Sequence, residues 1–159
     1  MKTATATHKT ANGFSRPGED LFTLWPRLVR EYFTRIRKLG LPINLATTLL
    51  RLHLHPNISE PAVLAELDGR PRQTMTWILD ALEKRGLAAR YPHPNDRRRK
   101  IIRLLPKGHQ LAKAICRELT DFETSAWRAL GDTERPAFCR MITRYTDILA
   151  AINTAIAQK

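Results

Sequence analysis

The chain has 159 residues, of which 43% are hydrophobic and 26% charged, a balance typical of one globular domain. Its formal net charge is +12, so we expect a polyanionic partner, with nucleic acid as the leading candidate. No apolar run approaches the roughly 20 residues that a membrane-spanning helix needs. The two cysteines are too few for a disulfide framework and suit a reducing compartment. The composition therefore predicts a cytoplasmic protein that does not enter the membrane.

Residues 1–17 contain basic but no acidic side chains, and they lack the apolar stretch of a secretory signal. We interpret them as a flexible tail before a single domain over residues 18–159. Apolar residues at helical spacing predict a first helix over about 19–39, which Gly40 and Pro42 end. A second helix is expected over 45–55, with its inward face formed by Leu45, Leu49, Leu52 and Leu54.

A short helix and a longer one are predicted next, with a tight turn between them. Ser59 is the expected cap of the short helix, which stops at Asp68-Gly69 and carries Val63, Leu64 and Leu67. The longer helix spans residues 71–85, ends at Gly86 and has an apolar stripe of Met75, Ile78, Leu79 and Leu82. Two helices joined by a tight glycine turn form a helix-turn-helix.

After Gly86 the pattern changes to that of a hairpin, with strands expected at 87–91 and 100–105 around a polar loop, 92–99. Pro106 then opens a long helix to about Leu130, and a last helix, capped at Asp132 or Thr133, runs nearly to the end. The predicted fold is mainly α with a small β-hairpin wing. The winged helix-turn-helix core covers about 44–105, and long helices cover about 19–39 and 106–157.

The predicted wing carries four consecutive cations, and one acidic residue, Asp96, precedes them. The cations are Arg97, Arg98, Arg99 and Lys100. Such a cluster favours contact with phosphates or with the negative potential of a narrow minor groove. The alternative is a solvated basic turn.

The longer helix of the pair presents polar side chains opposite its apolar stripe. Arg72, Gln73 and Thr76 lie in its first turns, where a recognition helix contacts base edges, and Thr74 suits a phosphate. Trp77 lies on the same side, and either covers apolar protein surface, which we favour, or packs on DNA.

The segment from Glu60 to Gly108 resembles the MarR family of winged helix-turn-helix transcription regulators. The resemblance is carried by Leu79–Leu87, His93–Lys100, Leu104 and Lys107-Gly108. It implies that Arg98 enters the minor groove and that Asp96 pairs with it to hold the loop. The chain departs from the family at Trp77, where a basic residue is usual, and at Leu105, where a threonine cap is usual.

The resemblance also implies a homodimer, because the first, fifth and sixth helices of such regulators interleave with those of a partner. The apolar residues expected at this interface are Leu21, Trp25, Phe138, Met141, Ile142, Tyr145, Ile148, Leu149 and Ile152. A small aromatic or phenolic effector is implied in a cleft beside these helices, with Trp25, Tyr32 and Arg51 as candidate contacts.

We therefore predict a sequence-specific regulator that binds a pseudo-palindromic double-stranded DNA operator, a repressor released by an effector. Two alternatives remain, a protein-interaction module and a sequence-tolerant architectural DNA protein. The histidines lack the spacing of a helical metal site, and Cys116 and Cys139 are interpreted as buried small hydrophobes rather than redox sensors. Without a phosphate loop, nucleophile elbow or paired carboxylates, we predict no enzyme, no metal and no cofactor.

Overall fold

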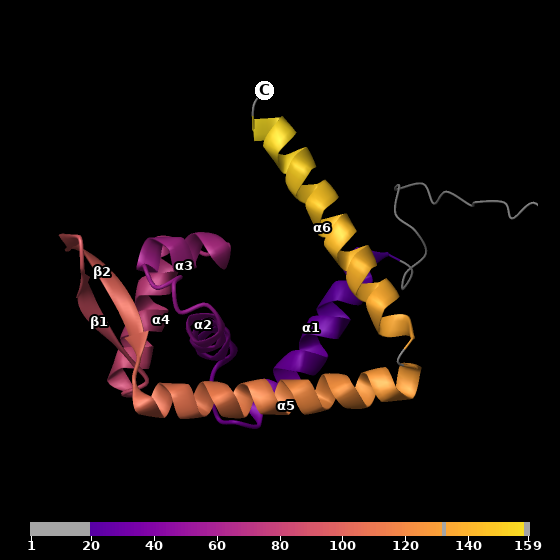
Figure 1. Ribbon diagram of the computed structural model, residues 1–159, viewed down its shortest axis with the longest axis horizontal. Helices are drawn as coiled ribbons and strands as arrows, with labels where there is room; N and C mark the ends of the chain where they lie inside the picture. Colours follow the sequence, from indigo (N-terminus) through magenta and orange to yellow (C-terminus); the bar gives the residue numbers. More distant parts are fainter. Residues whose placement is uncertain (1–19, 132, 158–159) are drawn as a thin grey trace, which may run out of the picture. The chain divides into compact units, whose positions relative to one another are not determined.

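The computed structural model describes residues 20–131 and 133–157. The described chain forms six helices and one hairpin (Figure 1), in the order α1 Leu21–Arg37, α2 Ile43–Leu54, α3 Pro61–Leu67, α4 Arg72–Lys84, β1 Ala88–His93, β2 Asp96–Leu104, α5 Pro106–Leu130 and α6 Glu134–Ala157. This confirms the predicted fold class. Two compact units divide the chain, the first ending at Glu118 and the second beginning at Leu119. The predicted tail, residues 1–17, lies outside the described residues.

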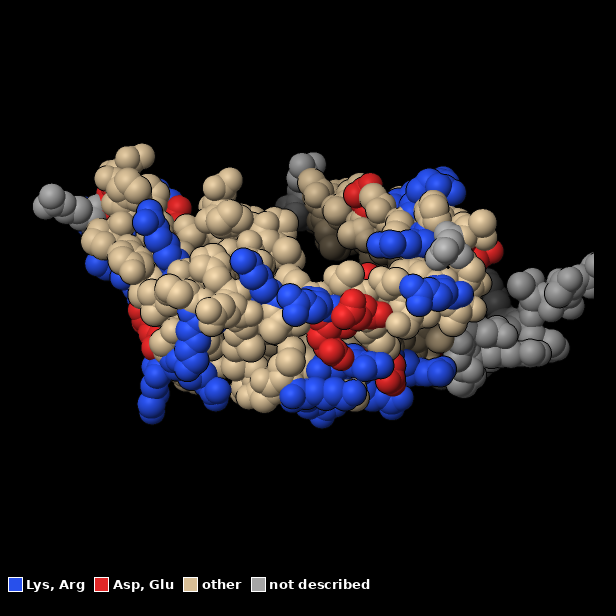
Figure 2. Space-filling model, turned by 60° about the horizontal axis from the view of Figure 1, so that its bottom comes forward, with Lys and Arg blue, Asp and Glu red and all other residues tan. Residues whose placement is uncertain are grey.

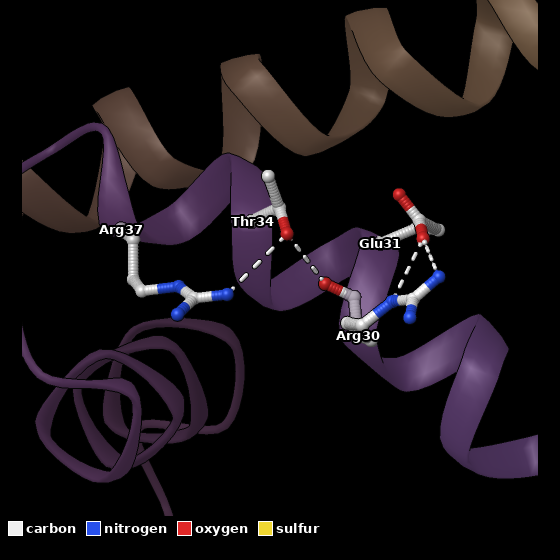
Figure 3. A network of polar contacts seen from close by, with 4 residues as sticks. All are labelled: Arg30, Glu31, Thr34 and Arg37. Carbon is white, nitrogen blue, oxygen red and sulfur yellow. Dashed lines mark hydrogen bonds and ion pairs between the residues drawn. The ribbon is translucent and has the colours of Figure 1, made fainter.

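α1 begins at Asp20, whose carboxylate accepts a hydrogen bond from the Thr23 amide at 2.7 Å. Its polar face is internally bonded (Figure 3): the Thr34 hydroxyl donates to the Arg30 carbonyl at 2.9 Å and accepts from Arg37 at 3.4 Å. The helix buries Ile36 and leaves large apolar side chains exposed, namely Leu21, Leu24, Trp25 and Leu28.

The core of the first unit is assembled by α2, α3 and α4. The predicted stripe on α4 is confirmed, since Met75, Ile78, Leu79 and Leu82 are each no more than 2% exposed. α2 and α3 bury Leu45, Leu49, Leu52 and Leu64 against it. Leu54 was expected to face inward, but it is 59% exposed because α2 ends at that residue.

The N-cap of α3 is Glu60, and the prediction that Ser59 caps this helix is wrong. Glu60 provides no side-chain cap hydrogen bond. The carbonyl of Ser59 instead accepts the amide of Ile102 at 2.8 Å, which ties the segment before α3 to strand β2. The backbone hydrogen bond between Ser59 and Ile102 thus prevails over the preference of serine for the N-cap position.

The hairpin is longer than the sequence predicted. β1 and β2 pair antiparallel from Ala88 opposite Leu104 to His93 opposite Asp96, with an irregularity between Pro92 and His93. The strands therefore extend through most of the segment that we expected to be loop. As a consequence, residues 97–100 lie on β2. Because Pro92 pairs with Lys100 and His93 with Asp96, residues 97–99 form an irregularity of the strand.

α5 starts in close contact with the residue that follows α4. The Leu105 amide donates to the Leu87 carbonyl at 3.0 Å. A Cβ atom placed on Gly108 would lie 1.9 Å from that same carbonyl oxygen. Gly108 is buried in the first turns of α5, and the absence of its side chain is what permits this approach.

The second unit contains the end of α5, Gly131 and α6. The rings of Trp127 and Phe138 meet edge to face, with centroids 5.4 Å apart. The Glu134 amide donates to the Gly131 carbonyl at 3.1 Å. Of the two predicted caps, Asp132 lies outside the described residues, and Thr133 directly precedes the first residue of α6. No helix in the described part of the chain is long and apolar enough to cross a bilayer.

Replacing Gly108 by alanine should lower the free energy of unfolding by about 1–3 kcal/mol, the usual cost of overpacking. In an unconstrained helix the same change gains roughly 1 kcal/mol, so the contact with the Leu87 backbone reverses the sign. Urea denaturation followed by circular dichroism measures the effect. Gln110→Ala, at an exposed position of the same helix, is the matched control, and a Gly108→Ala protein as stable as the parent would contradict the close contact.

Candidate nucleic-acid interface

The turn between α3 and α4 is built on Gly69, whose φ of 58° is readily adopted only by glycine. The amides of Gly69 and Arg70 close the end of α3 by donating to the carbonyls of Glu66 and Ala65. The Asp68 carboxylate, 6% exposed, lies 2.5 Å from Nε of Arg51 on α2. This ion pair fixes the helix-turn-helix against α2.

Arg51 thus has a structural partner, although the sequence predicted it as an effector contact. Trp25, a second predicted contact, is 54% exposed on α1, and Tyr32 is half-buried. An open depression of about 430 Å³ lies elsewhere in the first unit, between the turn at Leu39–Leu41, the end of α4 and the start of α5. None of the three predicted effector residues lines it.

The predicted recognition helix, α4, presents its polar side to solvent. Arg72, Gln73 and Thr76 are exposed and Thr74 is half-buried. The Thr76 hydroxyl donates to the Arg72 carbonyl at 3.0 Å and keeps its acceptor capacity. The N-cap, Pro71, makes no side-chain cap hydrogen bond, so the positive end of the helix dipole is available to an anion.

Trp77 is 64% exposed on this same helix. The interpretation favoured from the sequence, that its indole covers apolar surface of the protein, is therefore wrong. Trp77 lies two positions after the inward-facing Met75, which turns it by about 200° around the helix and away from the buried stripe. A large exposed aromatic ring beside Gln73 and Thr76 is available for contact with another molecule.

The base of the wing is fastened to α4 by ion pairs. The Arg90 guanidinium of β1 lies 2.7 Å from the Asp80 carboxylate and also pairs with Glu83. The Arg90 amide donates to the Glu83 carboxylate at 2.8 Å. These contacts hold the hairpin against α4, and no local pattern in the sequence predicted them.

At the tip of the wing, the Asp96 carboxylate accepts a hydrogen bond from the backbone amide of Arg98 at 2.9 Å. The resemblance implied that Asp96 pairs with Arg98, and the contact is made to the backbone rather than to the guanidinium. The side chains of Arg98 and Lys100 are exposed. The side chain of Arg97 lies outside the described residues.

Arg99 makes a two-pronged ion pair with Glu60, in which Nε lies 2.9 Å from one carboxylate oxygen and Nη2 bonds the other. Hydrogen bonding to Arg99 lowers the pKa of Glu60, and the same contact raises the pKa of Arg99. Arg99, predicted to contact DNA, is thus engaged in holding β2 against the start of α3. The sequence does show an acidic residue, Glu60, just before α3. Local capping patterns do not predict that its partner is Arg99, which lies 39 residues away on β2.

The two cysteines are both reduced. Cys116 is half-buried and Cys139 is exposed on α6, so the expectation that both are buried is wrong for Cys139. Among the described residues, no three His, Cys, Asp or Glu side chains gather in a way that suits a metal ion.

The MarR family model matches residues 41–100, which include α2, α3, α4, β1 and the cationic part of β2. This segment of the chain is similar to the MarR family. The Escherichia coli (strain K12) protein named Transcriptional repressor MprA is 33% identical over 97 residues, which make up 60% of this chain and 55% of that protein. The chain thus spans about half the length of this curated relative.

Solved MarR-family structures share the fold. The structure of MarR covers 88% of this chain and 97% of its own, with 22% identity and a TM-score of 0.73. The S. aureus MepR–DNA complex covers 84% and 96%, with 22% identity and a TM-score of 0.69. The similarity reaches beyond the matched segment, to most of the long helices that flank the winged helix.

Replacing Glu60 by glutamine should lower the melting temperature near neutral pH, because it removes the charge that Arg99 pairs with. The folded-state pKa of Glu60 is lowered from 4.5, so the stabilisation is present above the unfolded-state pKa and disappears as the pH falls through the lower folded-state value. Thermal melts of parent and variant across acidic pH should therefore converge. Glu66→Gln removes an exposed carboxylate elsewhere on α3 and is the control. A parent–variant difference that persists into strong acid would contradict the role of this ion pair.

Proposed function

We propose that this chain is a transcription regulator that binds specific double-stranded DNA sites as a homodimer. The observation that carries the proposal is the combination of an exposed polar side on α4 with exposed cations on β2, in two elements that the ion pairs of Arg90 hold together. Basic side chains are also spread over the face drawn in Figure 2, with fewer acidic ones among them. A net charge of +12 suits a phosphate backbone.

In this proposal α4 lies in the major groove. Arg72 and Gln73 reach base edges, since arginine pairs well with guanine and glutamine with adenine. The uncapped N-terminus of α4 and Thr74 contact a backbone phosphate, which positions the helix without reading sequence. Trp77 packs on a sugar or a thymine methyl group, because its exposed ring offers apolar area on the same side of the helix.

The wing contacts the neighbouring minor groove through Arg98, with Lys100 on the adjacent phosphates. Arg98 and Lys100 both lie on β2 and both have exposed side chains. Asp96 fixes the backbone of Arg98, and Arg99 braces the strand against Glu60. An arginine held in this way reads the narrow, strongly negative groove of A·T-rich DNA.

The homodimer is supported by apolar side chains that this chain leaves exposed. On α6 these are Phe138, Met141, Ile142, Tyr145, Ile148, Leu149, Ile152 and Ile156, each at least 37% exposed. Leu21 and Trp25 on α1 are likewise exposed. So large an apolar area on one chain favours burial against a second copy, and a two-fold dimer matches a pseudo-palindromic operator.

We further propose that the protein acts as a cytoplasmic repressor and has no catalytic activity. The name of the matched E. coli relative, a transcriptional repressor, supports this direction of control. Release by a small aromatic or phenolic effector completes the proposal, with Trp25 and Tyr32 on α1 as contacts. Arg51 contributes only if its ion pair with Asp68 opens.

Arg98→Ala should weaken binding to a duplex selected from a randomised library by about 1–3 kcal/mol and leave the melting temperature unchanged. The side chain is exposed, so its loss removes a DNA contact and no core packing. Fluorescence anisotropy at fixed salt measures the affinity. Arg117→Ala deletes the same charge from an exposed site on α5 and should cost much less. If Arg98→Ala and Arg117→Ala lost the same affinity for the duplex, Arg98 would contribute only its charge, and the proposal would be contradicted.

Ile148→Glu should dissociate the dimer, because it buries a carboxylate in the proposed interface. Light scattering coupled to size exclusion should find the parent chain dimeric at micromolar concentration and the variant monomeric or aggregated. Ala150→Glu, two residues along and on the opposite side of α6, is the matched control and should remain dimeric. A parent chain that is monomeric yet binds a palindrome tightly would contradict this account of α6.

A further inference from the structure

Two histidines that are 56 residues apart in the chain meet in the first unit. His53 lies on the last turn of α2 and His109 on the first turn of α5. Their Nδ1 atoms are 3.3 Å apart, and the two rings stand edge to face with centroids separated by 5.5 Å. Their positions in the sequence show no metal-site spacing, because the fold alone brings them together.

The contact between the two nitrogens is one that a metal ion can replace. A hydrogen bond between them requires one ring to donate and the other to accept, so one Nδ1 already presents a lone pair to the shared space. His53 is half-buried and His109 is exposed, which leaves the site open to ions from solvent. Neutral imidazole is also the commonest metal ligand among side chains.

We propose that the Nδ1 atoms of His53 and His109 form a two-histidine site for Zn²⁺, with water completing the coordination. Zinc–nitrogen bonds of about 2.0–2.1 Å at tetrahedral angles place two ligand nitrogens roughly 3.3–3.4 Å apart. The observed separation of 3.3 Å agrees with this edge of the tetrahedron. Ligands at right angles, as in octahedral or square-planar sites, would be only about 2.8–3.0 Å apart.

The site differs in kind from a closed structural zinc site. Among the described residues no third His, Cys, Asp or Glu joins the pair, so two positions remain for water. Such a site binds zinc exchangeably and loses it at acidic pH, since protons compete for both imidazoles. It is independent of the proposed DNA-binding function, and its failure would leave that proposal intact.

Zinc held there would cross-link α2 to α5. In the sequence, α2 precedes the helix-turn-helix and α5 follows the hairpin. α2 also carries Arg51, which anchors the turn before α4 through its ion pair with Asp68. Because the ligands come from two elements that separate on unfolding, the folded state binds the ion and the unfolded chain binds it less well. Zinc should therefore raise the melting temperature of the protein.

The test uses the full-length chain without a histidine tag and zinc sulfate as the only added metal. Competition with a chromophoric chelator at physiological salt should find one zinc ion bound per chain. His53→Gln and His109→Gln should each weaken binding by at least the roughly 10- to 100-fold that loss of an outer-sphere partner costs, since each removes a direct ligand. His55→Gln, an exposed imidazole just beyond the end of α2, is the matched control and should bind zinc like the parent.

A second measurement works on the parent protein and does not depend on the variants folding. In imidazole ¹⁵N spectra, zinc should shift the Nδ1 resonances of His53 and His109 together and leave His55 and His93 unchanged. Unchanged zinc affinity in either single variant, coordination through a lone ring, or the absence of zinc-dependent shifts would overturn the proposal.

Discussion

The carbonyl group of Leu87 is the junction on which this winged helix depends. Its residue closes the C-terminal end of α4, where the Leu87 amide donates to the Leu82 carbonyl at 2.9 Å. Its oxygen accepts the Leu105 amide, and Gly108 packs directly on it. One buried residue thus joins α4, both strands of the hairpin and the first turn of α5. A side chain added at Gly108 would push the start of α5 away from Leu87 and so from the end of α4.

The cations of the first unit fall into two groups, those that pair with a carboxylate of the protein and those whose side chains are exposed. Arg51, Arg90 and Arg99 each contact a carboxylate of the protein, and together they brace α2, α4 and β2. Arg72, Arg98 and Lys100 extend from the same framework with exposed side chains. The paired arginines hold the helices and the strand in place, and this gives the exposed cations defined positions. Defined positions are what a specific binding site requires. The net charge of +12 therefore overstates the number of cations that remain available to a polyanionic partner.

The sequence pattern predicted helix faces and helix starts correctly where apolar spacing or a proline gives a strong local signal. The stripe at Met75, Ile78, Leu79 and Leu82 predicted which side of α4 is buried, and Pro106 predicted where α5 begins. Strand ends were predicted less well, because polar residues such as Arg98 are compatible with either a loop or an exposed edge of a two-stranded ribbon. Ser59 illustrates the same limit: its favourable capping chemistry was outweighed by a backbone hydrogen bond to Ile102, more than forty residues away.

The sequence by itself determined the order of the helices, the hairpin wing, the buried side of α4 and the basic character of the surface, because each depends on residues a few positions apart. It did not determine the partners of individual charged side chains. Tertiary structure decided that Arg99 pairs with Glu60, that Asp96 holds the amide rather than the guanidinium of Arg98, and that Trp77 is exposed. It also brought His53 and His109 within 3.3 Å. The physical reason is that the contacts of Arg99 and of the two histidines arise from the packing of elements distant in sequence. The contact of Asp96 is local, but a carboxylate beside several donors has many possible partners until the backbone conformation is fixed.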